Sequence, residues 1–303
     1  MKTWLSRFGL VVALLCIGAA LSIVKPVFLT FPNLLNVVRQ ISINGILAVG
    51  VTYVLLTGGV DLSLGSVVAL SGVVAAIFAH PGDWPVIVPV AAGVLVGAAC
   101  GGINGLVVTK GRVAPFIVTL GMMTAARGVA LVVSGGKPVS NLGESFRWIG
   151  SGGVPVIVFL AVSCVSWVLL SNLRLGRHLY AVGGNENAAR ASGINVEGVK
   201  LFAYTICGAL AGLGGVVLAA RITTGQPNAG VGYELDAIAA VVIGGTSLSG
   251  GVGGVGGTIL GALLMGVINN GLDLLNVSSY YQAIVKGIII VGAVWLDQRK
   301  EKS

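Results

Sequence analysis

The sequence predicts an all-α polytopic membrane protein, and two features of its composition indicate this class. Of the 303 residues, 55% are hydrophobic and only 9% are charged, whereas a soluble domain carries about 25% charged residues. A soluble surface cannot be built from so few charges. Glycine accounts for 48 residues, and small residues let membrane helices approach each other closely. We therefore expect closely packed transmembrane helices.

Uncharged apolar segments divide the chain into about ten predicted spans. A helix needs about 20 residues to cross a hydrocarbon core about 30 Å thick. The run 237–272 is too long for one untilted helix, and its glycine-rich centre predicts a break, with the first of two crossings unusually short. The predicted spans are 8–24, 34–57, 62–79, 85–108, 113–134, 154–171, 201–221, 235–248, 256–275 and 281–296.

The basic residues predict that both termini face the cytoplasm. With the N-terminus inside, eleven Lys and Arg residues fall in cytoplasmic segments and four on the opposite face, while Arg39, Arg127 and Lys286 fall within spans. The net charge of +8 also favours contact with anionic lipid. Nucleic-acid binding is disfavoured, because no basic patch is interleaved with aromatic residues. The first span resembles a signal peptide, but the even number of spans predicts that it is retained.

Residue patterns for catalysis or metal binding are lacking. His80 and His178 fall on opposite predicted faces, so they cannot share a site. The four cysteines occur singly in apolar segments. Gly136 and Lys137 are followed by proline, which does not fit a G-x-x-x-x-G-K-[ST] phosphate-binding loop. We expect a non-catalytic subunit without a metal, and any ATP would bind another chain.

Polar residues in or beside the spans are candidates for a solute path, because burying them in a membrane is costly. For the carboxylates that begin predicted helices, capping is the favoured role and contact with a solute the alternative. Asparagines within spans either bond neighbouring helices, the commoner role, or line a path for a hydroxylated solute. The candidate path residues are Asn44, Gly58, Gly59, Asp61, Ser63, Asn104, Asp236, Asn269 and Asn270.

Glycines recur every four residues in three places, which predicts close helix contacts within one chain or between two. The predicted stripes are Gly97, Gly101 and Gly105; Gly208 and Gly212; and Gly253, Gly257 and Gly261. The segments 58–63 and 244–249 also share the pattern G-G-x-x-L-S, each joining two spans on the predicted cytoplasmic side. Internal repeats with glycine-interrupted helices are typical of transporters.

The longest polar stretch, 174–200, lies between two predicted spans. Within it, 185–192 predicts a short helix bounded by glycines. Glu186 lies near its start and Arg190 near its end, as the helix dipole and an i,i+4 ion pair both favour. This segment is either a solvated connector or a rigid element that docks onto a cytoplasmic partner.

Four sequence blocks resemble the membrane permease of ribose-type bacterial ATP-binding-cassette sugar importers. They are GGVDLSLGSVVALSG, GRHLYAVGGNENAARASGINVEGVK, YELDAIAAVVIGGTSLSGGVGGVGGTILGALLMGVINNGL and SSYYQAIVKGIIIVGAVWLD. The resemblance covers about residues 31–297. It implies one permease domain over 1–303, with a cytoplasmic coupling loop at about 172–200, in the bacterial inner membrane.

The resemblance also implies partners and roles. It implies a homodimer, a periplasmic sugar-binding protein that delivers a monosaccharide, with ribose the first candidate, and a cytoplasmic ATPase that binds ATP and magnesium. The permease itself would hold no cofactor. By the same resemblance, contact with the ATPase falls to Asn185, Glu186, Asn187, Arg190 and Gly193.

Three other readings remain open. An amino-acid-type ATP-binding-cassette permease is the nearest. An ion-coupled secondary transporter would need intramembrane carboxylates, and only Asp61, Asp236 and Asp273 are available, all near predicted helix ends. A non-transporting scaffold would need neither the polar loop nor interrupted helices.

Overall fold

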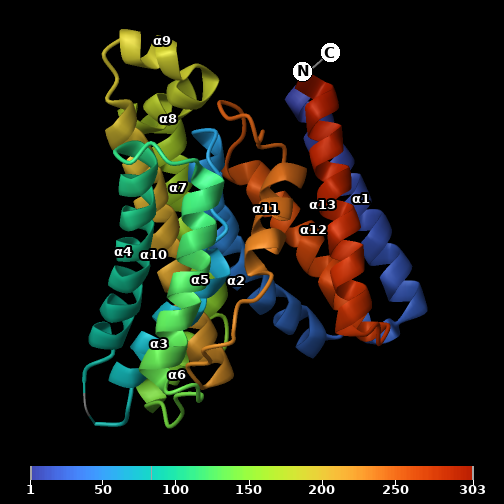
Figure 1. Cartoon of the computed structure of the whole chain (residues 1–303). Helices are drawn as coiled ribbons and strands as arrows, with labels where there is room; N and C mark the ends of the chain where they lie inside the picture. The colour runs from blue at the N-terminus through green and yellow to red at the C-terminus, as the bar shows by residue number, and fades with distance from the viewer. Residues whose placement is uncertain (1, 83, 302–303) are drawn as a thin grey trace.

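The computed structural model describes residues 2–82 and 84–301, and the regular structure of this part of the chain is helical (Figure 1). The elements are α1 (Lys2–Val24), the 3-10 helix η1 (Pro26–Leu29), α2 (Phe31–Leu56), α3 (Leu64–Phe78), α4 (Ile87–Thr109), α5 (Pro115–Ser134), α6 (Glu144–Ile149), α7 (Val154–Asn172), α8 (Arg174–Gly184), α9 (Glu186–Ala191), α10 (Val196–Ile222), α11 (Tyr233–Ile243), α12 (Val255–Leu274) and α13 (Ser279–Glu301).

The predicted class is confirmed. In the described part of the chain, six helices are long and apolar enough to cross a membrane, namely α2, α4, α5, α7, α10 and α12. Shorter apolar stretches occur in α1, α3 and α13. Each of the ten predicted spans coincides with a helix, and α11 is unusually short, as predicted. The polar stretch 174–200 contains two helices, of which α9 was predicted and α8 was not.

The glycine stripes explain how the longest helices pack. A Cβ atom added at Gly97 or Gly101 of α4 would overlap backbone oxygens of α10, and one added at Gly208 would overlap α4 in return. The two stripes therefore face each other within one chain, with backbones too close for any side chain. Tight packing of this kind makes α4 and α10 one rigid unit.

The third stripe is only partly as predicted. Gly257 and Gly261 lie on α12 against the backbone of α11. Gly253 does not belong to the stripe, because it precedes the helix in a loop where its φ is 142°. The glycine-rich segment between α11 and α12 breaks the helix as predicted, and Gly245, Gly250 and Gly251 also have positive φ there.

The helices form a larger group around α10 and a smaller group of α1, α12 and α13, with α11 between them (Figure 1). Packing contacts agree in part, since α10 packs against α2, α3 and α4, whereas α12 packs against α1 and α11 and joins the two groups through α2. The two ends of the chain lie on the side of the molecule that carries α8 and α9, and α6 lies at the opposite end (Figure 1).

Candidate functional site

The predicted coupling helix is present as α9, and local caps define it. The side chain of Asn185 accepts a hydrogen bond from the backbone N–H of Ala188 at 2.9 Å, which fixes the start of the helix. Gly193 follows the last turn with a φ of 81°, a conformation that favours glycine. A helix of six residues is unstable alone, so its neighbours must hold it.

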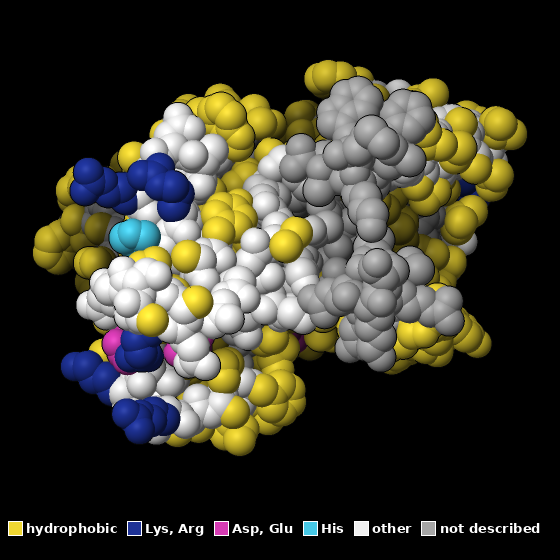
Figure 2. Space-filling model, turned by 90° about the horizontal axis from the view of Figure 1, so that it is seen from above, with side chains coloured by type: hydrophobic (Ala, Val, Ile, Leu, Met, Phe, Trp, Pro, Cys, Tyr) yellow, Lys and Arg dark blue, Asp and Glu magenta, His cyan; other side chains and the backbone are white. Residues whose placement is uncertain are grey.

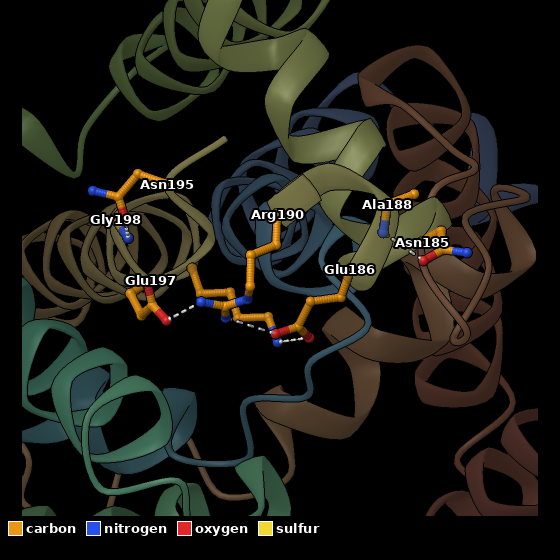
Figure 3. A network of polar contacts seen from close by, with 8 residues as sticks. Asn185, Glu186, Ala188, Arg190, Asn195, Glu197 and Gly198 are labelled. Atoms are coloured by element: carbon orange, nitrogen blue, oxygen red, sulfur yellow. Dashed lines mark hydrogen bonds and ion pairs between the residues drawn. The ribbon is translucent and has the colours of Figure 1, made fainter. Parts of the chain in front are cut away.

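An ionic network ties α9 to the start of α10 (Figure 3). Arg190 Nη1 lies 2.7 Å from Glu197 Oε1, and Arg190 Nη2 lies 3.5 Å from Glu186 Oε1. Lys200 Nζ lies 2.6 Å from Glu186 Oε2. The hydrogen bond from Lys200 lowers the pKa of Glu186, so this carboxylate stays ionised at neutral pH. The predicted Glu186–Arg190 pair is confirmed, whereas no pattern in the sequence indicated Glu197 and Lys200 as partners.

The α9 segment presents its polar side chains outward. The five residues assigned to coupling are all exposed, namely Asn185, Glu186, Asn187, Arg190 and Gly193. Ala189 is buried against the hydrophobic cluster that includes Val196 and Val199 of α10. One apolar contact and the ionic network therefore fix the helix, and its other faces are open to a partner.

Basic side chains gather on the same face (Figure 2). They lie over one part of the face seen from above, with acidic side chains beside some of them. The exposed ones come from the α4–α5 connection, α8 and α9: Lys110, Arg112, Arg174, Arg177 and Arg190.

The two G-G-x-x-L-S segments lie next to each other. A Cβ at Gly58 would come 3.3 Å from the carbonyl oxygen of Ser249, and the backbone N–H of Gly251 donates to the carbonyl of Leu56 at 3.0 Å. Gly59 is buried against the side chain of Tyr204, whose hydroxyl donates to the Val60 carbonyl at 3.3 Å. The sequence repeat therefore corresponds to a contact between two interrupted helical segments.

Asp61, Ser63 and Asn104 form one buried polar cluster. Asp61 Oδ1 accepts hydrogen bonds from the Ser63 backbone N–H at 2.8 Å and from its hydroxyl at 2.6 Å, and Asn104 Nδ2 donates to Ser63 Oγ at 3.1 Å. The expected capping role is wrong, because the carboxylate bonds the residue before α3 and no side chain caps that helix. The bond closes a local Asx turn instead.

Asp236 and Asn269 form a second buried cluster, completed by Lys286. Asp236 Oδ2 lies 2.7 Å from Lys286 Nζ and accepts from Asn269 Nδ2 at 3.3 Å. Among the described residues, Asp236 Oδ1 and Asn269 Oδ1 are buried without a hydrogen-bond partner. Asp236 lies in the first turn of α11, as predicted, but its carboxylate makes no cap hydrogen bond there and instead joins α11 to α12 and α13. Lys286, which the sequence left without a partner, is its counter-ion.

The remaining path candidates lie apart from these clusters. Asn270 exchanges two hydrogen bonds with Asn33 of α2, at 3.0 and 3.1 Å, which is the interhelical role expected for most such asparagines. Asn44 is half-buried within α2. The candidates therefore form two polar clusters and one interhelical pair rather than a single site.

Six helices that are long and apolar enough to cross a membrane, packed around buried polar clusters, define a polytopic membrane protein. The chain belongs to the family described as branched-chain amino acid transport system / permease component, whose model matches residues 33–294.

Curated relatives match over nearly their whole length. The chain is 49% identical over 310 residues to the ribose import permease of Escherichia coli, covering 99% of this chain and 96% of that protein. It is 48% identical over 303 residues to the ribose import permease of Bacillus subtilis, covering 98% and 94%. It is 37% identical over 309 residues to the L-arabinose transport system permease of Escherichia coli, covering 100% and 93%. Comparison with solved structures gave no match.

These findings confirm the resemblance predicted from the four sequence blocks. The family description mentions amino acids, whereas the three relatives above carry sugar names, so the amino-acid alternative is disfavoured. A secondary transporter or a scaffold is disfavoured for the same reason.

Proposed function

We propose that this chain is the transmembrane permease of an ATP-driven monosaccharide importer, with ribose as the first candidate solute. The observation that carries the proposal is the identity of 45–49% to ribose import permeases over nearly the whole chain. The chain acts as one permease domain over 1–303, pairs with a second copy of itself, and receives the sugar from a periplasmic binding protein. ATP and magnesium bind a separate cytoplasmic ATPase, and the permease holds no cofactor.

The permease crosses the bacterial inner membrane ten times, with both termini in the cytoplasm. Six long helices, three shorter apolar ones and the short α11 support this count. The common location of the chain ends, α8 and α9 supports a cytoplasmic assignment for that face (Figure 1). The exposed basic residues of the same face agree with the positive-inside rule and favour contact with anionic lipid.

The ATPase docks on α9, the exposed short helix of the coupling loop at about 172–200. Support comes from the exposure of the five coupling residues and from the ionic network that makes α9 rigid relative to α10. A rigid element transmits a partner's displacement better than a flexible connector does. Arg190 and Glu186 act mainly within this network, so Asn187 is the better candidate for direct contact with the ATPase.

The solute path passes the two buried polar clusters. The partnerless oxygens of Asp236 and Asn269 support this, because buried acceptors without a donor are costly and sugar hydroxyls are donors. The cluster of Asp61, Ser63 and Asn104 offers a similar mixture of acceptors and donors. Gly58 and Gly59 shape the backbone beside it.

Reconstitution tests the proposal directly. The chain, with the ATPase and the sugar-binding protein encoded beside it, is placed in liposomes, and uptake of radiolabelled ribose is measured. We expect uptake that requires ATP and both partners. Uptake by the chain alone under an ion gradient would refute the importer and support a secondary transporter.

A matched pair of variants tests the docking surface. Asn187→Trp adds bulk on exposed α9 and should abolish ATP-dependent uptake, while Gly121→Ala on α5, whose added methyl group meets nothing within 4 Å, should leave it unchanged. Gly193 is a poorer choice for substitution, because its positive φ would strain any larger residue. Normal uptake by the Asn187 variant would place the ATPase elsewhere.

A further inference from the structure

A helix that the sequence did not predict joins the coupling helix to the membrane-embedded segments. α8 ends at Gly184, and Asn185 alone separates it from α9. Its buried residues Leu179 and Val182 belong to the same hydrophobic cluster as Leu56, the last residue of α2. α8 is therefore packed against the core beneath the proposed docking surface.

Three backbones meet at the end of α8. A Cβ added at Gly183 would overlap the carbonyl oxygen of Leu56 and lie 2.5 Å from the backbone nitrogen of Gly251. A Cβ added at Gly250 would lie 2.8 Å from the nitrogen of Gly58 and 2.9 Å from the oxygen of Gly183. The end of α2, the loop between α11 and α12, and α8 are thus in direct backbone contact.

A hydrogen bond adds a second link one turn earlier on α8. The hydroxyl of Tyr180 donates to the carbonyl of Gly253 at 3.0 Å. Gly253 stands two residues before α12 begins at Val255. Together with the contacts of Gly183, this bond fixes α8 to the end of α2 and to the loop that precedes α12.

The contact has a mechanical consequence. Backbone atoms in close contact have no side chain that can change rotamer and absorb a displacement, so a shift of α8 must move both of its neighbours. One neighbour, the end of α2, leads through 57–63 to the cluster of Asp61. The other, the loop 244–254, follows α11, which carries Asp236. Both clusters of the proposed solute path are therefore connected to α9 through α8.

We propose that Gly183 and Tyr180 are positioning residues of the transport cycle, a proposal that rests on the import function proposed above. α8 acts as a rigid lever that carries a displacement of α9 to both interrupted segments at once. Gly183 sets the close approach, and Tyr180 prevents the loop 244–254 from sliding along α8.

Adjacent glycines provide the test. Gly183→Ala places a methyl group into the backbones of Leu56 and Gly251, whereas a Cβ at the neighbouring Gly184 meets nothing within 4 Å. Each variant is assembled with the ATPase and the sugar-binding protein in liposomes, and ATP hydrolysis and ribose uptake are measured in the same vesicles. We expect Gly183→Ala to lower the sugar imported per ATP hydrolysed about ten-fold, and Gly184→Ala to leave it unchanged.

Tyr180→Phe keeps the test decisive if Gly183→Ala does not assemble. It removes the hydroxyl that donates to Gly253 and keeps the ring, and it should lower the same ratio about three-fold. An unchanged ratio in an assembled Gly183→Ala complex overturns the proposal, as does an unchanged ratio in Tyr180→Phe when only that variant assembles. Absence of ribose uptake in the unmodified complex would instead refute the import function.

Discussion

Replacing Lys286 with methionine should destabilise the chain more than replacing its partner Asp236 with asparagine. Lys286 Nζ and Asp236 Oδ2 are 2.7 Å apart, but the side chains differ in exposure, 27% for Lys286 and 4% for Asp236. Without the lysine, the buried carboxylate keeps only the Asn269 amide, at 3.3 Å. Without the carboxylate, the partly exposed lysine can extend its ammonium group outward.

The magnitude follows from this difference in burial. Removing one partner of a fully buried ion pair costs about 3–5 kcal/mol, because the other charge is left uncompensated. Lys286→Met should cost about 3 kcal/mol, at the lower end, since the pair is partly open on the lysine side. Asp236→Asn should cost about 1 kcal/mol, the usual net value of a lost hydrogen bond. The double variant leaves no uncompensated charge, so it should be more stable than Lys286→Met alone.

The unmodified protein, the two single variants and the double variant are unfolded in mixed micelles, and circular dichroism gives the midpoint of unfolding of each. Lys137→Met serves as the control, because Lys137 is exposed and should leave the midpoint unchanged. The role of the ion pair would be refuted if the destabilisations of the two single variants added up strictly in the double variant, or if Asp236→Asn lowered the stability more than Lys286→Met.

Two further predictions concern the helix contacts and the coupling loop. Gly101→Ala should lower the melting temperature, since its methyl group would overlap the backbone of α10. Gly121→Ala, whose methyl group meets nothing within 4 Å, should instead gain up to about 1 kcal/mol in helix propensity. Equal unfolding midpoints for the two variants would contradict the close packing of α4 and α10. The ion pairs that lower the pKa of Glu186 stabilise the attachment of α9 fully at a pH above the usual range of carboxyl pKa values. This contribution is lost as the pH falls through the lowered pKa. Protease cleavage within 172–200 should therefore increase on acidification, and Glu186→Gln should be cleaved readily even at neutral pH.

Most of the helical framework could be predicted because its physical cause is local. The predicted span 154–171 became α7 (Val154–Asn172), since a run of apolar residues long enough to cross the bilayer has few alternatives to a helix. α11 was predicted to be short because the glycines after it favour positive φ, and the structure has Gly245 at 91°. The pair of Glu186 and Arg190 was predictable because helical spacing alone brings i and i+4 together.

The contacts between distant segments could not be predicted in the same way. Asp236 and Lys286 are 50 residues apart, and no local pattern states that α11 and α13 pack together. The capping role expected for Asp61 was wrong because an Asx turn and a helix cap use the same residue types and differ only in which N–H is bonded. α8 was missed because the predicted spans rest on uncharged apolar runs, whereas α8 is amphipathic, with Leu175, Leu179 and Val182 recurring at helical spacing between charged residues.

The polar contacts of α11 indicate where a displacement can enter this helix. Arg127 of α5 donates to the carbonyls of Pro227 and Ala229, at 2.5 and 2.7 Å, just before α11 begins. Asp236, in its first turn, is held by Asn269 and Lys286. The beginning of α11 is thus fixed by α5, α12 and α13, and its other end leads into a loop where several glycines have positive φ. Because α8 contacts that loop, a displacement of α9 would reach α11 at its glycine-rich end.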